Sequence, residues 1–214
     1  NNNPITILTF AASVWGMNDV THLGIYDIPM MSNIPNLVYL APTTYEEYIA
    51  MLDWSTEQRE HPVAIRVPGA VIHGEKPTKD YGILNKYETV QKGSGAAIIA
   101  LGTFFGMGKQ AAELIEKKTG VKPTLINPVY ITGIDEELLE SLKKDHKAVV
   151  TLEDGILDGG FGEKIARFYG DSDMRTVNFG LKKEFLDRYD ANEVLRQNGI
   201  TPEQIADRAA ELVK

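Results

Sequence analysis

The sequence predicts an α/β protein made of two units, each with a parallel or mixed β-sheet and covering helices. Short runs of β-branched and aromatic residues alternate with amphipathic stretches, which is the pattern of strands connected by helices. A stretch rich in glycine and lysine interrupts this alternation and is typical of a linker. We therefore expect a first unit at 1–72, a linker at 73–95 and a second unit at 96–214.

The first unit contains three predicted strands and one predicted helix. They are a buried strand at 5–10, a strand at 37–41, a helix at 45–58 and a strand at 63–67. Thr43 or Thr44 caps the helix, and the acidic residues of its first turn are favoured by the helix dipole. Apolar residues at helical spacing are expected to form its buried face: Tyr45, Tyr48, Ile49 and Leu52.

The second unit repeats the alternation of strands and helices. We expect strands at 97–101, 121–126, 148–152 and 174–179, and helices at 107–118, 135–144, 160–169 and from 201 onward. Gly120 lies just past the first of these helices, Asp135 caps the second, and Thr201 followed by Pro202 opens the last. Within the linker, 81–90 is expected to form a strand pair of its own.

The composition excludes several classes of protein. The chain has 214 residues, no cysteine and a formal net charge of -8. The lack of cysteine excludes disulfide frameworks, thiolate metal sites and iron–sulfur clusters, and the acidic balance disfavours nucleic acid as a partner. No apolar run approaches the about 20 residues of a membrane span, and the start does not resemble a signal peptide. We therefore expect a cytoplasmic protein without a membrane partner. Because the sequence lacks an initiator Met, we also expect it to be a piece of a longer protein.

His22 is the histidine whose position suggests chemistry. It follows Asp19 and Thr21 in a loop after the first strand, at the edge where parallel sheets bind ligands. A histidine beside a carboxylate titrates near neutral pH and can donate to an anionic substrate. The alternative is structural, with Thr21 capping a short helix. The other histidines are expected to be solvated at the surface: His61, His73 and His146.

Two acidic residues, Glu153 and Asp154, come directly after the predicted strand at 148–152. Acids at the end of a parallel strand can bind a metal ion or act as a base. The alternative is a strand-to-helix turn with flexible glycines and a capping acid. The sequence holds no phosphate loop, no zinc-protease motif and no nucleophile elbow. The residues alone therefore define neither a complete active site nor a metal site.

Several motifs, in this order, resemble the transketolase superfamily, and within it most closely the 1-deoxy-D-xylulose-5-phosphate synthase family. They are Thr21-His22-Leu23-Gly24, Asn33-Ile34-Pro35-Asn36-Leu37-Val38, Ala41-Pro42-Thr43, Pro62-Val63-Ala64-Ile65-Arg66, Leu101-Gly102-Thr103, Val150-Thr151-Leu152-Glu153-Asp154, Gly159-Gly160-Phe161-Gly162 and Asn178-Phe179-Gly180-Leu181. The resemblance implies that 1–72 is the C-terminal part of a pyrimidine-binding domain. It also implies that 96–214 is a transketolase C-terminal-like domain.

The resemblance implies a function for the full-length protein. It would be a transferase that uses thiamine diphosphate and Mg²⁺ to condense pyruvate with glyceraldehyde 3-phosphate, with loss of carbon dioxide. Both cofactors would be bound mainly by residues outside this chain, which would be inactive alone. The expected assembly is a homodimer that includes the upstream half of the same protein. The alternatives are a divergent transketolase-like or 2-oxo acid dehydrogenase β-type enzyme with a different acceptor, or a non-catalytic dimerisation fragment.

The resemblance also assigns roles to individual residues. His22 matches a catalytic histidine that lines the substrate channel near the reactive carbon of the cofactor. Phe10 matches an aromatic residue that packs on the aminopyrimidine, although an alignment without gaps places Ile7 there. The implied substrate-binding residues are Asp19, Thr21 and Arg66, with Pro68 beside the last.

Two arginines of the family are replaced in this chain. Ala11 and Gly69 stand where the family has arginines that clamp the phosphate of the acceptor. Neither residue can supply the forked guanidinium that binds a phosphate through two parallel hydrogen bonds. We therefore expect an acceptor other than glyceraldehyde 3-phosphate.

Overall fold

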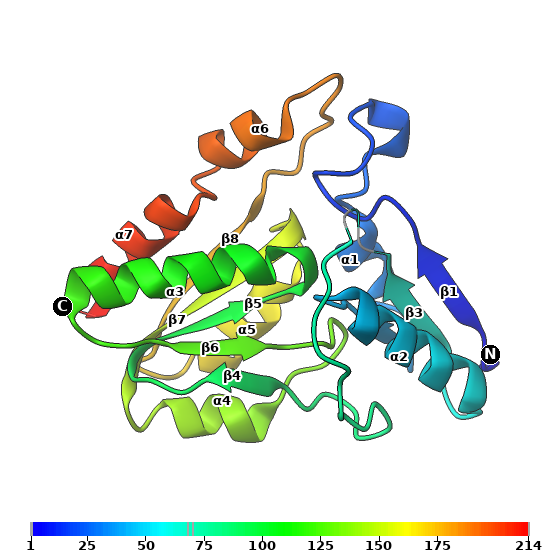
Figure 1. The fold of residues 1–214 in the computed structure, drawn as a ribbon, viewed down its shortest axis with the longest axis horizontal. Coiled ribbons are helices and arrows are strands. Elements are labelled where there is room, and N and C mark those ends of the chain that lie inside the picture. The colour runs from blue at the N-terminus through cyan, green and yellow to red at the C-terminus, as the bar shows by residue number, and fades with distance from the viewer. Residues whose placement is uncertain (1, 68, 70, 214) are drawn as a thin grey trace.

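The computed structural model describes residues 2–67, 69 and 71–213, which form two β-sheets (Figure 1). Sheet A consists of three parallel strands in the order β1 (Thr6–Thr9), β3 (Val63–Arg66) and β2 (Val38–Leu40). The three strands predicted for the first unit are therefore confirmed. Strand β1 is only half-buried, contrary to the prediction, because within the described residues it pairs with β3 along a single edge.

Helix α2 (Tyr45–Glu57) follows β2 and begins where the sequence predicts. The Thr44 hydroxyl accepts the N–H of Glu47 at 3.1 Å, so Thr44 is the cap. The predicted buried face is only partly right: Tyr48 and Leu52 pack partly buried against a core cluster, while Tyr45 is exposed. The side chains that α2 buries fully are Glu47, Met51 and Ser55. The buried Glu47 carboxylate is satisfied by the N–H of Thr43 at 2.7 Å and by the side-chain amide of Asn127 at 3.1 Å. Periodicity of apolar residues does not detect a face that buries a hydrogen-bonded acid.

Sheet B has five strands in the order β4-β6-β5-β7-β8. Their bounds are β4 (Glu88–Gln91), β5 (Gly95–Ala100), β6 (Thr124–Asn127), β7 (His146–Ile156) and β8 (Arg175–Leu181). All neighbours are parallel except β4, which pairs antiparallel with β6. The expected strand pair within 81–90 is therefore wrong, because the strand of this segment joins sheet B.

Helices cover both faces of sheet B (Figure 1). One face packs against α3 (Phe105–Thr119), α6 (Ala191–Gln197) and α7 (Pro202–Val213). The other face packs against α4 (Glu136–Leu142) and α5 (Phe161–Tyr169). Helix α6 and three short turns are additions to the predicted elements: η1 (Val20–His22), α1 (Asp27–Met31) and η2 (Gly102–Phe104). Among the described residues, no helix combines the length and apolar character needed to cross a membrane.

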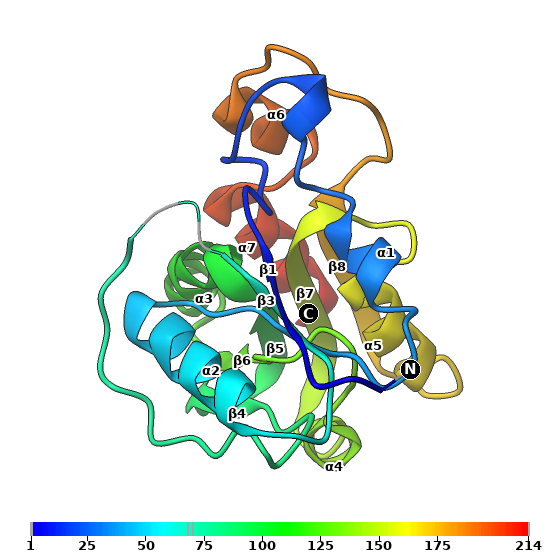
Figure 2. The same cartoon turned by 90° about the vertical axis from the view of Figure 1, so that its right-hand side faces the viewer.

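The two sheets meet at the carboxyl ends of their strands, and Figure 2 shows β1 and β3 in front of sheet B. Arg66, the last residue of β3, donates from Nη2 to the carbonyl of Asp154 in β7 at 2.8 Å. The segment after β6 runs along β2, where the N–H of Ile131 donates to the carbonyl of Tyr39 at 2.7 Å. One core cluster contains apolar side chains from both sheets. The two sheets are therefore packed against each other and share a core.

A buried carboxylate fixes the start of α5. Glu153 in β7 accepts the N–H of Phe161 at 2.7 Å and the N–H of Gly162 at 2.8 Å. Of the two interpretations open for Glu153, the structure supports capping, since its oxygens satisfy donors that the first turn of a helix leaves unpaired. Burial raises the pKa of Glu153 to about 7, although both hydrogen bonds act in the opposite direction.

This raised pKa predicts a pH dependence of stability. A carboxyl group whose pKa is higher in the folded than in the unfolded chain stabilises the fold below its ordinary pKa of about 4.3. That contribution is lost as the pH rises toward 7. We expect the free energy of unfolding to fall across this window relative to Glu153→Gln, by about 1.4 kcal/mol per unit of raised pKa. Urea unfolding of both proteins between pH 4.5 and pH 8 measures the difference. Parallel curves would contradict the assignment.

Candidate functional site

Three of the predicted site residues come together in one exposed turn. Asp19 caps the short helix η1, and its Oδ1 accepts the N–H of Thr21 at 3.0 Å. The same oxygen lies 3.1 Å from Nδ1 of His22, which in turn lies 2.8 Å from the Thr21 hydroxyl. The cap of this turn is therefore Asp19 and not Thr21. Because the three residues are close in sequence, one turn of backbone is enough to bring their polar atoms together.

The electrostatics of this turn favour an ionised carboxylate beside the imidazole. Hydrogen bonds from Thr21 and then from His22 lower the pKa of the Asp19 carboxyl. The His22 side chain is 56% exposed, so it can be reached from solvent. A carboxylate held against Nδ1 fixes the orientation of the ring and directs Nε2 away from Asp19. The arrangement can donate or accept a proton at Nε2.

The two residues considered for packing against a cofactor differ in exposure. Phe10 follows the last residue of β1, an edge strand of sheet A in the part of the chain that the structure describes, and is 70% exposed. Ile7 is partly buried and packs against the core cluster that both sheets share. An exposed aromatic face is available for stacking, whereas a core aliphatic residue is not. The structure therefore leaves Phe10 as the accessible residue of the two.

Arg66 lies apart from the exposed turn and is buried. Its Nε donates to Oδ2 of Asp27 at 2.8 Å, and its Nη2 donates to Oδ1 of Asp27 at 3.1 Å and to the Asp154 carbonyl at 2.8 Å. The hydroxyl of Tyr39 also donates to the Asp27 carboxylate. A guanidinium with these partners serves to tie β3, α1 and β7 together. Pro68, named beside Arg66, lies outside the described residues.

Asp154 has a structural role that the sequence did not indicate. Its Oδ1 accepts the N–H of Val14 at 2.9 Å, and its Oδ2 accepts the hydroxyl of Thr103 at 2.7 Å. Burial raises the pKa of this carboxyl, while Arg66 and the hydrogen bonds counteract the effect. Within 2–67, 69 and 71–213, no three acidic or histidine side chains form a group that could hold a metal ion. Glu153 therefore caps α5, and Asp154 binds the loop after β1 to β7.

One cavity adjoins the exposed turn. It has a volume of about 400 Å³ and is lined by residues 14–19 and by residues 189–191. Asp19 is part of its wall, so the polar turn lies at the margin of a space that a small molecule can enter. Segments from opposite ends of the chain meet at this cavity, which explains why the sequence did not reveal it.

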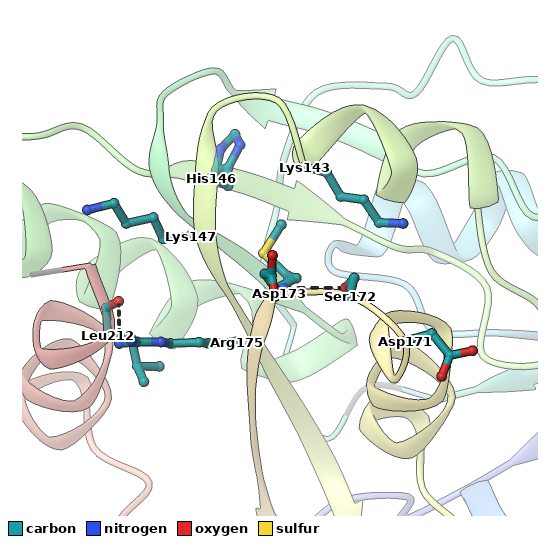
Figure 3. A pocket seen from close by; sticks show the side chains of 9 residues that line it. Lys143, His146, Lys147, Asp171, Ser172, Asp173, Arg175 and Leu212 are labelled. Atoms are coloured by element: carbon teal, nitrogen blue, oxygen red, sulfur yellow. Dashed lines mark hydrogen bonds between the residues drawn. The ribbon is translucent and has the colours of Figure 1, made fainter.

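A larger pocket of about 650 Å³ lies at the opposite edge of sheet B, where β7 and β8 begin (Figure 3). Figure 3 shows Lys143 and Lys147 pointing away from each other, and Arg175 donates to the carbonyl of Leu212 at 3.3 Å. His146 lies at this edge but is buried, with Nε2 2.8 Å from the Thr124 hydroxyl. Its predicted place at the surface is therefore wrong, whereas His73 is exposed as expected. The cations of this pocket do not converge on a common point.

Comparison with known proteins assigns relatives over almost the whole chain. The chain is 33% identical over 99% of its length to a 1-deoxy-D-xylulose-5-phosphate synthase of Clostridium perfringens strain SM101. It is 30% identical over 99% of its length to the synthase of the same name from Clostridium tetani. These matches cover 35% and 34% of the two relatives, so the chain spans about a third of their length.

Solved structures share the fold. A split-gene transketolase, described as an inactive β4 tetramer, superposes with a TM-score of 0.79 at 21% identity, over 98% of this chain and 67% of that one. A transketolase mutant from Pichia stipitis superposes with a TM-score of 0.75 at 19% identity, over 98% of this chain and 30% of that one. The family described as "Transketolase, C-terminal domain" matches residues 85–205, more than half of the 214 residues. The chain therefore belongs to the transketolase family and carries the C-terminal domain of that family.

Proposed function

We propose that this chain is the C-terminal part of a thiamine-diphosphate-dependent transferase that joins pyruvate to an aldehyde with loss of carbon dioxide. The observation that carries the proposal is the similarity, along 99% of the chain, to proteins named 1-deoxy-D-xylulose-5-phosphate synthase. The exposed turn with Asp19, Thr21 and His22 supports it, because the turn offers a proton donor beside a cavity. The full-length enzyme acts as a cytoplasmic homodimer.

In this proposal, His22 is the catalytic residue of the chain. Its Nε2 donates a hydrogen bond to the substrate oxygen that gains negative charge. Asp19 holds the imidazole by Nδ1, and Thr21 keeps the pair in place. Asp19 and Thr21 also contact the substrate from the same turn. General acid–base groups of this kind contribute about 10²–10⁴-fold to a rate.

Of the proposed cofactor, thiamine diphosphate, the described residues offer a partner for the aminopyrimidine end. Thiamine diphosphate supplies the stabilised carbanion that the carboligation needs. The exposed ring of Phe10 offers a flat surface for its aminopyrimidine ring. We propose that Mg²⁺ and the diphosphate are held mainly by residues outside this chain.

We further propose that 1–72 is the last part of a pyrimidine-binding domain, that 73–95 is a linker and that 96–214 is the C-terminal domain. The half-buried strand β1 supports the first assignment, because Ile5 is 51% exposed and Phe10 is 70% exposed beside a strand that pairs on one edge. Strands from the upstream half of the protein would cover Ile5 and the open edge of β1, whereas the ring of Phe10 would face the cofactor. The linker then includes β4, which binds it to sheet B.

The acceptor differs from glyceraldehyde 3-phosphate in this proposal. Ala11 and Gly69 supply no guanidinium, and Nε and Nη2 of Arg66 are engaged by Asp27 and Asp154. Among the described residues of this edge of sheet A, the Nε–Nη2 fork of Arg66 is therefore already occupied and is not offered to a phosphate. An unphosphorylated aldehyde therefore matches this edge of sheet A better than a phosphorylated one. The same observation is compatible with the alternative, a transketolase-like or 2-oxo acid dehydrogenase β-type enzyme with another acceptor.

The role of His22 predicts a loss of turnover. We expect His22→Ala in the full-length protein to lower kcat at least 10-fold, at the low end of the range for general acid–base groups. Release of carbon dioxide from pyruvate in the presence of an aldehyde measures it. His73→Ala is the matched control, since His73 is also exposed and also lies beside a carboxylate, Glu46, at 2.8 Å. Equal activities of the two variants would return His22 to a structural role.

The division of the cofactor site predicts a difference in binding. Calorimetry of the full-length protein with Mg²⁺ should detect thiamine diphosphate, whereas the 214-residue chain alone should bind it too weakly to measure. Removing Mg²⁺ with a chelator should abolish binding by the full-length protein. A full-length protein that does not bind thiamine diphosphate in the presence of Mg²⁺ would overturn the proposed function.

If Gly69 stands in place of a phosphate-binding arginine, an arginine introduced there should restore recognition of a phosphorylated acceptor. A side chain at Gly69 has room, because among the described residues the nearest atom to its Cβ would be the carbonyl oxygen of Trp15, at 3.8 Å. We expect Gly69→Arg to raise kcat/KM for a phosphorylated aldehyde relative to its unphosphorylated analogue by about 10-fold, since hydrogen bonds to charged groups are worth about 1.5–3 kcal/mol. Gly69→Gln controls for the length of the side chain. A wild-type enzyme that prefers glyceraldehyde 3-phosphate would contradict the proposed acceptor.

A further inference from the structure

The stretch that carries His22 is a closed loop, which we call the His22 segment, residues 11–25. Near its start, the N–H of Ser13 donates to the carbonyl of Ala11 at 2.8 Å. Near its end, Gly24 packs so closely on that carbonyl that a Cβ would lie 1.7 Å from its oxygen. The two ends of the segment therefore touch each other, and the exposed turn lies between them.

Both ends of the His22 segment are bound to the carboxyl end of β7. The N–H of Val14 donates to Oδ1 of Asp154 at 2.9 Å. Two residues further along β7, the N–H of Ile156 donates to the carbonyl of Ile25 at 3.0 Å. The first of these contacts depends on a side chain, while the second joins two backbone groups. Asp154 is thus the side chain of β7 that a substitution can test.

The Asp154 carboxylate is fully buried, and both of its oxygens have partners. Oδ2 accepts the hydroxyl of Thr103, in η2, at 2.7 Å. Hydrogen bonds to an ionised acceptor are stronger than those between neutral groups. Removing this acceptor leaves buried donors unpaired, which costs more than the bonds themselves contribute. The carboxylate therefore holds the start of the His22 segment firmly to sheet B.

The loop before α6 holds the same segment from the other side. The hydroxyl of Tyr189 donates to the carbonyl of Val14 at 3.0 Å, and the N–H of Arg188 donates to the carbonyl of Asn18 at 2.6 Å. Trp15 packs edge-to-face on Phe104, with ring centroids 5.3 Å apart. Asp187 accepts the N–H of Val20 at 3.2 Å at the surface, whereas the acceptor Asp154 is buried. The second unit thus contacts the His22 segment at several points.

We propose that Asp154 is a positioning residue: its buried carboxylate anchors the His22 segment to β7 and so fixes where His22 stands. The catalytic consequence rests on the proposed function, whereas the anchoring itself does not. By this device the C-terminal domain takes part in the chemistry without touching the substrate. Its neighbour Glu153 has the separate task of capping α5.

Trp15 allows the anchoring to be measured without an activity assay. The chain has two tryptophans, and Trp54→Phe leaves Trp15 as the fluorescent reporter inside the His22 segment. Its side chain is 41% exposed, so release of the segment would increase its contact with solvent. We expect Thr103→Val and Asp154→Ala to raise the acrylamide quenching constant of Trp15 at least 1.5-fold and to shift its emission to longer wavelength. Asp154→Asn, which keeps an acceptor for the Val14 N–H, should restore most of the protection.

Thr151→Val is the matched control for Thr103→Val. The hydroxyl of Thr151 donates to Asn178 at 2.9 Å and does not contact the His22 segment, so its loss should leave Trp15 unchanged. Far-UV circular dichroism identifies any variant that fails to fold. If Asp154→Ala fails to fold, the quenching of Thr103→Val alone tests the anchoring. Equal quenching in Thr103→Val and Thr151→Val would overturn the proposal.

Activity of the full-length protein then separates the two proposals. If anchoring positions His22, Thr103→Val should lower kcat several-fold with little change in the KM for pyruvate, while Thr151→Val should leave both unchanged. Increased quenching with unaltered kcat would support the anchoring by Asp154 but overturn the catalytic role of His22. Unaltered quenching would overturn the anchor, whatever the outcome for thiamine diphosphate binding by the full-length protein.

Discussion

The buried contact between Arg66 and two acidic residues determines how the rest of the molecule is arranged. Arg66 ends β3 and reaches both the carboxylate of Asp27, at the start of α1, and the backbone of β7 at Asp154. A buried guanidinium is tolerated only when its charge and its donors are matched, so these elements cannot separate without leaving a charge unpaired in the core. The two sheets are therefore joined by their carboxyl ends, and loops from both sheets gather at one junction.

Most of the fold could be predicted because most of it is encoded locally. Short apolar runs located every strand of sheet A, and caps such as Thr44 and Asp135 located helix starts, since a cap acts on donors within its own first turn. The errors lie where distant residues decide. The face that α2 buries depends on Asn127, far along the chain, and the burial of His146 depends on Thr124 in a neighbouring strand.

In the candidate site, too, local contacts could be predicted from the sequence and long-range contacts could not. Asp19, Thr21 and His22 could be grouped from the sequence because a single turn brings them together. The place of Arg66 and Asp154 could not, since their partners are separated from them by many residues and by a change of sheet. The acidic pair near the end of β7 did carry a signal, but the two neighbours have different roles. Adjacent residues in a strand point to opposite faces, so Glu153 meets α5 while Asp154 meets the loop that follows β1.

The open edge of β1 has a consequence for how the molecule behaves in concentrated solution. A parallel strand with unpaired backbone groups on one side is a template for another extended chain, and natural proteins protect such edges with charge, proline or a covering segment. Pro4 lies just ahead of β1, but Ile5 and Phe10 flank it with exposed apolar surface. Colloidal behaviour then depends on the net charge of -8, whose mutual repulsion is weakened by salt. Added salt therefore weakens the repulsion that opposes edge-to-edge pairing of isolated chains.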